Sequence, residues 1–181
     1  SGYHSKGRTV LYIHKDPMKS LIDKFNRKIN YLRVSVTDRC NLRCVYCTPI
    51  EGVLKISHEE ILRYEEILRV VEVAVKKGIS KVRVTGGEPL VRKGVVNFIR
   101  FLSKIHGVQD LSLTTNGILL RDFATALFDA GLRRINVSID SLNRLKFKEI
   151  TGGGDLKRVW EGTEEAMRSG LFPVKINTVI I

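Results

Sequence analysis

The sequence contains few cysteines, few aromatic residues and no long hydrophobic run, and each scarcity excludes a class of protein. The three cysteines, at positions 40, 44 and 47, are odd in number and closely grouped. This argues against a secreted disulfide framework and favours a reducing compartment, the cytoplasm. No apolar run approaches the roughly 18 residues that suggest a membrane span, so no membrane partner is expected. Aromatic residues make up only 7% of the chain, so no surface for stacking nucleic-acid bases is indicated.

Acidic residues are outnumbered, since 31 Lys and Arg stand against 19 Asp and Glu and give a net charge of +12. A chain this basic favours an anionic partner such as nucleic acid, a phosphorylated small molecule or an acidic membrane surface. The basic residues are spread along the sequence instead of being gathered in a tail. A solvated basic surface would account for most of the lysines, so charge alone leaves the partner open.

The chain does have a regular alternation of strand and helix patterns. Residues 1–17 lack clear periodicity and are interpreted as an upstream or expression-derived leader, and residues 18–181 as one core domain. Strands are predicted at 31–37, 81–85, 110–115, 134–140 and 174–180. Helices are predicted at 58–77, 92–105, 122–130 and 155–169, with Ser57 and Glu60 as a capping box for the first and Asp122 as N-cap of the third. Strands joined by such helices indicate parallel α/β pairing.

Each predicted strand has one apolar and one polar face, unlike the near-continuous apolar strands of sheets covered on both sides. Helices must cover the apolar face, so Arg33, Arg83 and Lys175 are expected to share the inner face of a curved sheet. This favours a cavity for an anion; the alternative is a sheet face exposed to solvent. Five strand–helix units cannot close an eight-unit barrel. We therefore expect an incomplete, partial TIM-type barrel of parallel strands with outer helices, truncated at its C-terminus.

The cysteines follow the first predicted strand with the spacing C-x3-C-x2-C. They should therefore lie in a loop at the carboxyl end of the strand, where barrel folds place their chemistry. Three thiolates are one ligand short of a structural zinc site, and His58 is the nearest histidine to complete one. Three thiolates on a four-iron cluster would instead leave one iron free to bind another molecule. A zinc-stabilised nucleic-acid-binding module and an iron–sulfur protein are both compatible with this spacing.

Longer motifs carry a family resemblance. The segment YLRVSVTDRCNLRCVYCTP (31–49) resembles the cluster loop of radical S-adenosylmethionine (SAM) enzymes, and most closely that of the GTP 3′,8-cyclase family of molybdenum cofactor biosynthesis. The similarity continues in the family's order at TGGEPL (85–90), LTTNG (113–117), NVSIDSL (136–142) and KINTV (175–179), and spans roughly residues 18–181. Thr48 departs from the family, in which a Met often follows the third cysteine.

The resemblance implies a role for individual residues. Cys40, Cys44 and Cys47 would ligate a 4Fe–4S cluster that cleaves SAM, as metal ligands and catalytic groups. Tyr46, Gly87 and Ser138 would contact SAM. The side chains implied to bind GTP are Arg33, Arg83, Thr114 and Lys175. By residue type alone, Gly86-Gly87 and Asn116-Gly117 also suit ordinary turns, and Asp140 and Ser141 suit helix caps.

The implied enzyme is a lyase that converts GTP to (8S)-3′,8-cyclo-7,8-dihydroguanosine 5′-triphosphate. Its partners would be GTP, an electron donor for the cluster, the next enzyme of the cofactor pathway and a second copy of the chain. The family has a second three-cysteine cluster in its C-terminal part, and no cysteine follows Cys47 here, so full activity of this chain is not expected. Another radical SAM enzyme, peptide-modifying or activating, would share the cysteine loop and GGEP but would not need cations on three strands.

Overall fold

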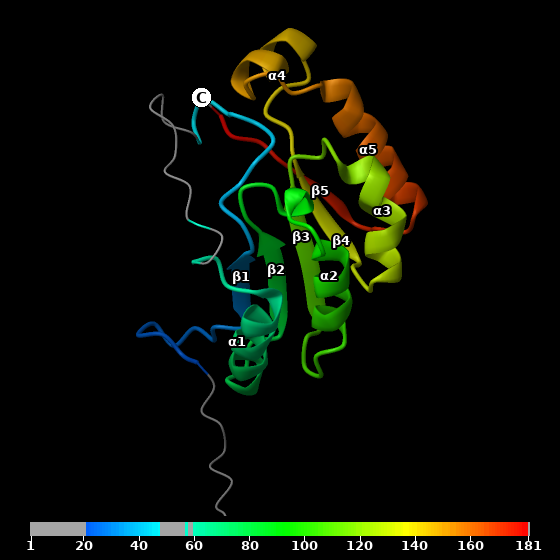
Figure 1. The fold of residues 1–181 in the computed structure, drawn as a ribbon. Helices are drawn as coiled ribbons and strands as arrows, with labels where there is room; N and C mark the ends of the chain where they lie inside the picture. Colours follow the sequence, from blue (N-terminus) through cyan, green and yellow to red (C-terminus); the bar gives the residue numbers. More distant parts are fainter. Residues whose placement is uncertain (1–20, 48–56, 58–59, 181) are drawn as a thin grey trace, which may run out of the picture.

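Helices cover one face of a five-stranded sheet and leave the other face open (Figure 1). The computed structural model describes residues 21–47, 57 and 60–180, so the leader expected at 1–17 lies outside the described residues. The strands are β1 (Tyr31–Ser35), β2 (Lys81–Thr85), β3 (Asp110–Thr115), β4 (Arg134–Ser138) and β5 (Val174–Asn177). The helices are α1 (Tyr64–Lys76), α2 (Val95–Ser103), α3 (Leu120–Asp129), α4 (Arg144–Ile150) and α5 (Leu156–Arg168), with a short 3-10 helix, η1 (Pro89–Val91).

The sheet has the order β1-β2-β3-β4-β5, and all neighbouring strands are parallel. This confirms the parallel α/β prediction, although β1, β4 and β5 end two or three residues earlier than the alternation suggested. Within the described residues β1 and β5 each pair on one side only, so the sheet does not close. The partial barrel expected from the sequence is therefore confirmed.

The hydrophobic core lies between the sheet and the helices. Its strand side chains come from the predicted apolar faces, and its helix side chains from the stripes facing them. Burying one such aliphatic side chain contributes about 1.5–3 kcal/mol. The fully buried members include Val82, Val84, Leu113, Ile135 and Val137 on the strands and Val71, Ile99, Leu102 and Leu127 on the helices.

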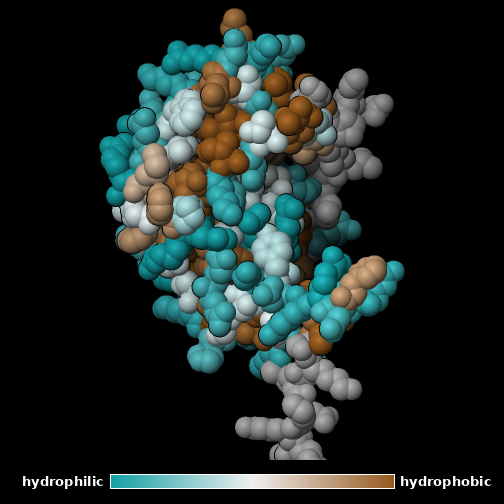
Figure 2. Space-filling view, turned by 180° about the vertical axis from the view of Figure 1, so that it is seen from behind, coloured by the Kyte–Doolittle hydropathy of each residue, from teal (hydrophilic) through white to brown (hydrophobic). Residues whose placement is uncertain are grey.

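The opposite face of the sheet is largely polar. Figure 2 views the molecule from behind Figure 1 and shows hydrophilic side chains across the middle of this face, with a hydrophobic area above them. Leu142, Trp160 and Ile176 are exposed and line one shallow hollow beside β5. The described strands thus leave the polar face open and do not themselves enclose the expected cavity. In the part of the chain that the structure describes, no helix is long and apolar enough to cross a membrane.

The start of α1 was predicted six residues too early. Ser57 Oγ does donate to Glu60 Oε2 at 3.0 Å, but the helix begins at Tyr64. There the Glu66 carboxylate accepts a hydrogen bond from the Arg63 backbone N–H at 2.7 Å. Residues 58 and 59 of the predicted helix lie outside the described residues.

One further local prediction was wrong, and one short helix was not predicted. Asp122 is not the N-cap of α3, because the helix begins at Leu120 and Asp122 lies in its first turn. The short helix α4 was not predicted, although Asn143 caps it by accepting from the backbone N–H groups of Leu145 and Lys146 at 3.0 and 3.1 Å. In both cases the helix begins only a few residues after a strand ends. Such a short connection gives the apolar periodicity too few residues to mark where the helix starts.

Candidate functional site

Two predicted cations lie side by side on the open face. Arg33 on β1 is in register with Arg83 on β2, which is in register with Ser112 on β3. Arg83 is half-buried, with its Nε 3.4 Å from Ser112 Oγ and its guanidinium carbon 5.3 Å from the centre of the Tyr31 ring. Arg33 is exposed. Guanidinium groups on adjacent strands are well placed to bind the oxygens of one anion.

A second row, two residues further along the strands, holds the other predicted substrate residues. Thr114 is opposite Asn136, and Asn136 is opposite Lys175. Lys175 is exposed, whereas Thr114 Oγ1 is buried and has no hydrogen-bond partner among the described residues. A buried hydroxyl left without a partner costs free energy, so this position favours a ligand that can bond to it.

Arg134 is a further cation on this face that was not singled out from the sequence. It is in register with Ser112, and its Nη2 lies 2.9 Å from Asp110 Oδ2. Strand parity could have identified it, because alternate residues of a strand share a face and Arg134 therefore lies on the same face as Asn136 and Ser138. The ion pair with Asp110 offsets its charge, so Arg134 adds less to an anion site than an unneutralised arginine.

The cysteine loop is anchored on one side to the segment that follows β2. The Gly87 N–H donates to the Thr37 carbonyl at 2.6 Å, and the Glu88 N–H donates to the Arg39 carbonyl at 2.8 Å. A Cβ on Gly87 would lie 2.4 Å from the Arg39 carbonyl oxygen, and one on Gly86 would lie 2.7 Å from the Thr37 carbonyl oxygen. Both glycines are therefore required by close backbone packing and not by positive φ.

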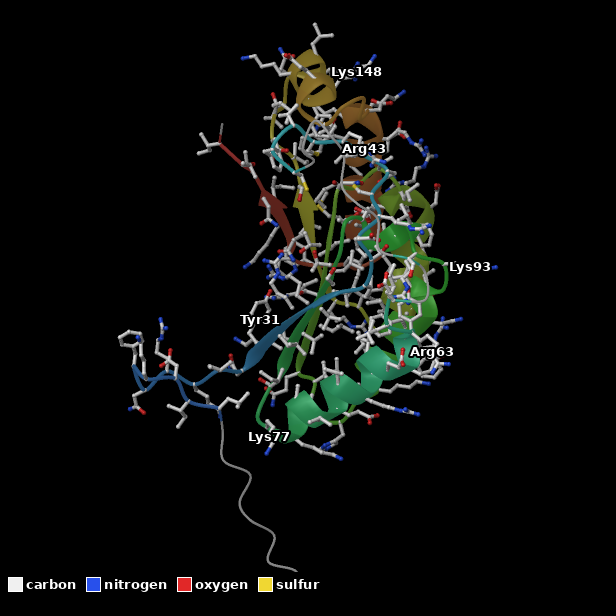
Figure 3. The ribbon with its side chains drawn as sticks, turned by 60° about the vertical axis from the view of Figure 1, so that its left-hand side comes forward. Tyr31, Arg43, Arg63, Lys77, Lys93 and Lys148 are labelled. Carbon is white, nitrogen blue, oxygen red and sulfur yellow. The ribbon has the colours of Figure 1, made fainter. Side chains whose placement is uncertain are left out.

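On its other side the loop is anchored to the end of α4. The Arg43 N–H donates to the Thr151 carbonyl at 3.0 Å, and the Val45 N–H donates to the Ile150 carbonyl at 2.9 Å. Figure 3 shows Arg43 and Lys148 of α4 at the same end of the molecule. The loop is thus held between β2 and α4 at the carboxyl end of the strands, as the position of the cysteines after the first strand predicted.

All three thiols are free, with Cys40 and Cys44 half-buried and Cys47 exposed. Burial raises the pKa of the Cys44 thiol; a hydrogen bond with Tyr46 opposes the rise, and the charges of Cys40, Asp140 and Cys47 add to it. These groups therefore lie close enough to interact. A coordinating metal deprotonates a thiol outright, so the raised pKa is no obstacle to ligation.

The residues present fit an iron–sulfur cluster better than a single metal ion. Among the residues that the structure describes, no three His, Cys, Asp or Glu side chains converge to hold one ion. A single zinc needs its sulfurs about 2.3 Å from one point, whereas three thiolates of a cluster each bind a different iron. The loop supplies three grouped, partly accessible thiols, which is the donor set that a cluster requires.

Tyr46 and Asp140 tie the cysteine loop to the ends of β4 and β5. Tyr46 Oη donates to Asp140 Oδ2 at 2.7 Å, and Asp140 Oδ1 accepts from the Val179 N–H at 3.0 Å. Burial, together with the hydrogen bond to Asp140, raises the pKa of Tyr46. Ser138 is half-buried at the end of β4, opposite Asn177. The interpretation of Asp140 as a helix cap was therefore wrong, because its oxygens serve long-range partners; Ser141 does accept from the Asn143 N–H, at 3.2 Å.

Glu88, the third residue of the GGEP motif, was given no role in the sequence analysis. It is only 1% exposed, and it accepts hydrogen bonds from the Leu90 N–H, the Thr115 hydroxyl and the Asn116 N–H at 3.0, 2.8 and 2.7 Å. Burial raises its pKa, while the three donors act in the opposite direction. The signal in the sequence that could have singled it out is a lone acidic residue within the otherwise uncharged segment 85–91.

Comparison with known sequences agrees with this geometry. The family model described as "Radical SAM superfamily" matches residues 34–181. A GTP 3′,8-cyclase of Alkaliphilus metalliredigens is 57% identical over 159 residues, covering 88% of this chain and 50% of the relative. A GTP 3′,8-cyclase of Thermodesulfovibrio yellowstonii is 56% identical over 160 residues, covering 88% of this chain and 50% of the relative. The chain spans about half the length of the curated relatives it matches.

Two solved structures share the fold. HydG, a maturase of the FeFe-hydrogenase, superposes with a TM-score of 0.67 at 16% identity, covering 82% of this chain and 34% of HydG. Streptococcus suis SuiB bound to S-adenosylmethionine superposes with a TM-score of 0.64 at 17% identity, covering 82% of this chain and 32% of SuiB. At these identities the likeness extends to the fold alone.

Proposed function

The chain belongs to the radical SAM superfamily, and from that premise we propose that it forms the cluster- and SAM-binding half of a GTP 3′,8-cyclase. One observation carries the proposal. Three grouped thiols lie at the carboxyl end of a parallel sheet whose polar face bears Arg33, Arg83 and Lys175. The identity of 57% to a curated cyclase supports the same reading.

Cys40, Cys44 and Cys47 would hold a 4Fe–4S cluster through their thiolates. When bound, the cluster supplies the electron that cleaves SAM to methionine and a 5′-deoxyadenosyl radical. The protein positions the reactants and limits the access of water. The two backbone anchors of the loop, at Gly87–Glu88 and at Ile150–Thr151, give the thiols their position before any cofactor arrives.

Tyr46, Gly87 and Ser138 are proposed SAM contacts. Gly87 is exposed, so its backbone is accessible to a ligand even though its missing Cβ is already required by Arg39. Ser138 lies on the polar face of β4, and Tyr46 is held beside that strand by its hydrogen bond to Asp140. All three residues therefore border the same end of the sheet as the thiols.

Arg33, Arg83, Thr114 and Lys175 are proposed to bind GTP. Two guanidinium groups in register can each donate paired hydrogen bonds to phosphate oxygens. The Thr114 hydroxyl, which has no partner among the described residues, can form a further hydrogen bond. The proposed product is (8S)-3′,8-cyclo-7,8-dihydroguanosine 5′-triphosphate, in which ribose C3′ is joined to guanine C8, and the proposed enzyme class is lyase.

The wider assignments follow from this function. The electron donor would serve the first cluster, and a second cluster would come from the half of the relatives' length that this sequence does not span. The product would pass to the next enzyme of molybdenum cofactor biosynthesis, and the enzyme would act as a homodimer. Three free, grouped cysteines support a reducing compartment, the cytoplasm.

Anaerobic reconstitution tests the cluster. We expect about four irons per chain, a cluster that dithionite reduces, and cleavage of SAM to 5′-deoxyadenosine. The Cys44→Ala variant should lose the cluster while keeping the far-ultraviolet circular dichroism of the parent. A chain that takes up zinc and never forms a reducible cluster would contradict the proposal.

Binding of GTP separates a cyclase from another radical SAM enzyme. Replacing Arg83 by Ala removes a half-buried charge from the polar face, so the affinity for GTP should fall about tenfold to hundredfold, measured by calorimetry. Arg158→Ala is the matched control. Arg158 is exposed on α5, so this substitution removes the same charge at a site away from the polar face. Equal losses in the two variants would argue against a GTP site on this face.

A further inference from the structure

Asn116 lies at the centre of a hydrogen-bond network that links the turns after β2 and β3 to the first cysteine. Its backbone N–H is held by Glu88 Oε2 at 2.7 Å, and its neighbour Thr115 donates to Glu88 Oε1 at 2.8 Å. Glu88 and Thr115 are 1% and 2% exposed. Because these partners are buried and fully engaged, they fix the backbone from which the Asn116 side chain extends.

The orientation of the Asn116 carboxamide is determined by its partners. Its Oδ1 accepts from the Ile118 N–H at 3.1 Å, so its Nδ2 must face the other way. On that side Nδ2 has two acceptors, Asn41 Oδ1 at 2.8 Å and Cys40 Sγ at 3.7 Å. An amide nitrogen carries two hydrogens, so each acceptor can take one.

Cys40 Sγ thus receives two N–H donors, since the Leu42 backbone N–H also donates to it at 3.4 Å. Hydrogen bonds to the sulfurs of an iron–sulfur site stabilise its negative charge and are among the levers that set its reduction potential. The donor from Leu42 belongs to the loop itself. The donor from Asn116 comes from the turn after β3 and is open to substitution.

We propose that Asn116 is a positioning residue of the cluster site, which orients the Cys40 sulfur through an N–H···S hydrogen bond and raises the reduction potential of the cluster bound there. The inference rests on the cluster assignment of the proposed function but not on the identity of the substrate. It assigns to the LTTNG motif a role that turn geometry alone does not require.

The test compares three variants of the reconstituted chain. Asn116→Ser keeps an oxygen for the Ile118 N–H but removes the amide donors without adding charge, and Asn116→Ala removes both. Asn97→Ala is the control, because Asn97 is an exposed amide on α2. Iron content is measured first, followed by the midpoint potential of the cluster in an anaerobic redox titration monitored by electron paramagnetic resonance.

We expect both Asn116 variants to move the midpoint to lower potential, so that at a fixed potential the ratio of reduced to oxidised cluster falls about 2- to 10-fold, as for the loss of one hydrogen bond. Asn97→Ala should match the parent. A folded Asn116 variant that loses most of its iron also supports the inference, since Cys40 is then mispositioned. Unchanged iron content and potential in both Asn116 variants would overturn it while leaving the cluster assignment intact. A parent chain that forms no cluster would overturn both.

Discussion

At the scale of single residues, Gly87 is required by close backbone packing beside the cysteine loop. A Cβ at this position would lie 2.4 Å from the Arg39 carbonyl oxygen, which is backbone and cannot rotate away. We expect Gly87→Ala to lower the free energy of unfolding by about 1–3 kcal/mol, measured by urea denaturation. Because Arg39 precedes Cys40, the same variant should also reduce iron uptake on reconstitution.

Gly153→Ala is the control for this prediction. Gly153 has open space around the position of a Cβ but a φ of +114°, so alanine there introduces backbone strain without pushing on the cysteine loop. Both variants should lose stability, and only Gly87→Ala should lose iron. If the two variants bind iron equally well, Gly87 does not position the loop.

Residue roles were predictable from the sequence only where they depend on spacing or parity. The grouping of Cys40, Cys44 and Cys47 and the shared face of Arg33 and Arg83 follow from the chain itself and are found in the structure. The contacts that hold the site together are not visible in this way. The Tyr46–Asp140 bond spans 94 residues and the Asn116–Cys40 bond 76, and no local pattern specifies either.

At the scale of elements, the first turn of α1 depends on one carboxylate. Glu66 accepts from the Arg63 backbone N–H at 2.7 Å, and this bond lowers the pKa of Glu66 below its ordinary value near 4.5. A lowered pKa means that the folded state favours the carboxylate. The stability that Glu66 contributes is therefore complete above its ordinary pKa and is lost as the pH falls through the lower, folded value.

The prediction is a pH-dependent effect of Glu66→Ala. The variant should be less stable than the parent at about pH 7, and the difference should shrink as the pH falls to about 3, because Glu66 of the parent is then progressively protonated. Urea denaturation at the two pH values measures it. Glu65→Ala, in the same turn, controls for the general interaction of a negative charge with the helix N-terminus. A difference that is the same at both pH values would rule out the cap.

The boundaries of elements were harder to predict than their existence, and α1 shows why. The sequence predicts a capping box at Ser57 and Glu60, whereas the helix in the structure starts with one six residues later, at Arg63 and Glu66. Arg92 favours the later start, because its Nη2 donates to the Leu62 carbonyl at 2.7 Å and its guanidinium lies 4.1 Å from the centre of the Tyr64 ring. A contact across 30 residues therefore sets a local boundary that periodicity places six residues earlier.

At the scale of the whole molecule, the sheet divides the surface into a helix-covered side and an open polar side. In Figure 3 Arg63 and Lys93 lie on the helix side, and Tyr31 lies toward the open side. The net charge of +12 is therefore distributed over both sides, and only part of it lies on the polar face. Composition could not reveal this division, whereas strand parity could, because it assigns each side chain to a face.

Nucleic acid is one of the anionic partners that a net charge of +12 would favour. Because the cations are distributed over both sides, we expect only weak, non-specific binding to a DNA duplex, falling steeply between about 50 and 200 mM salt. At about 150 mM salt the duplex should not displace GTP from the chain, since Arg83 is half-buried and screened less than an exposed charge. Fluorescence anisotropy of labelled DNA, with and without GTP and SAM, measures both. Tight binding that persists at this salt and does not respond to SAM would instead support a zinc-stabilised nucleic-acid-binding module.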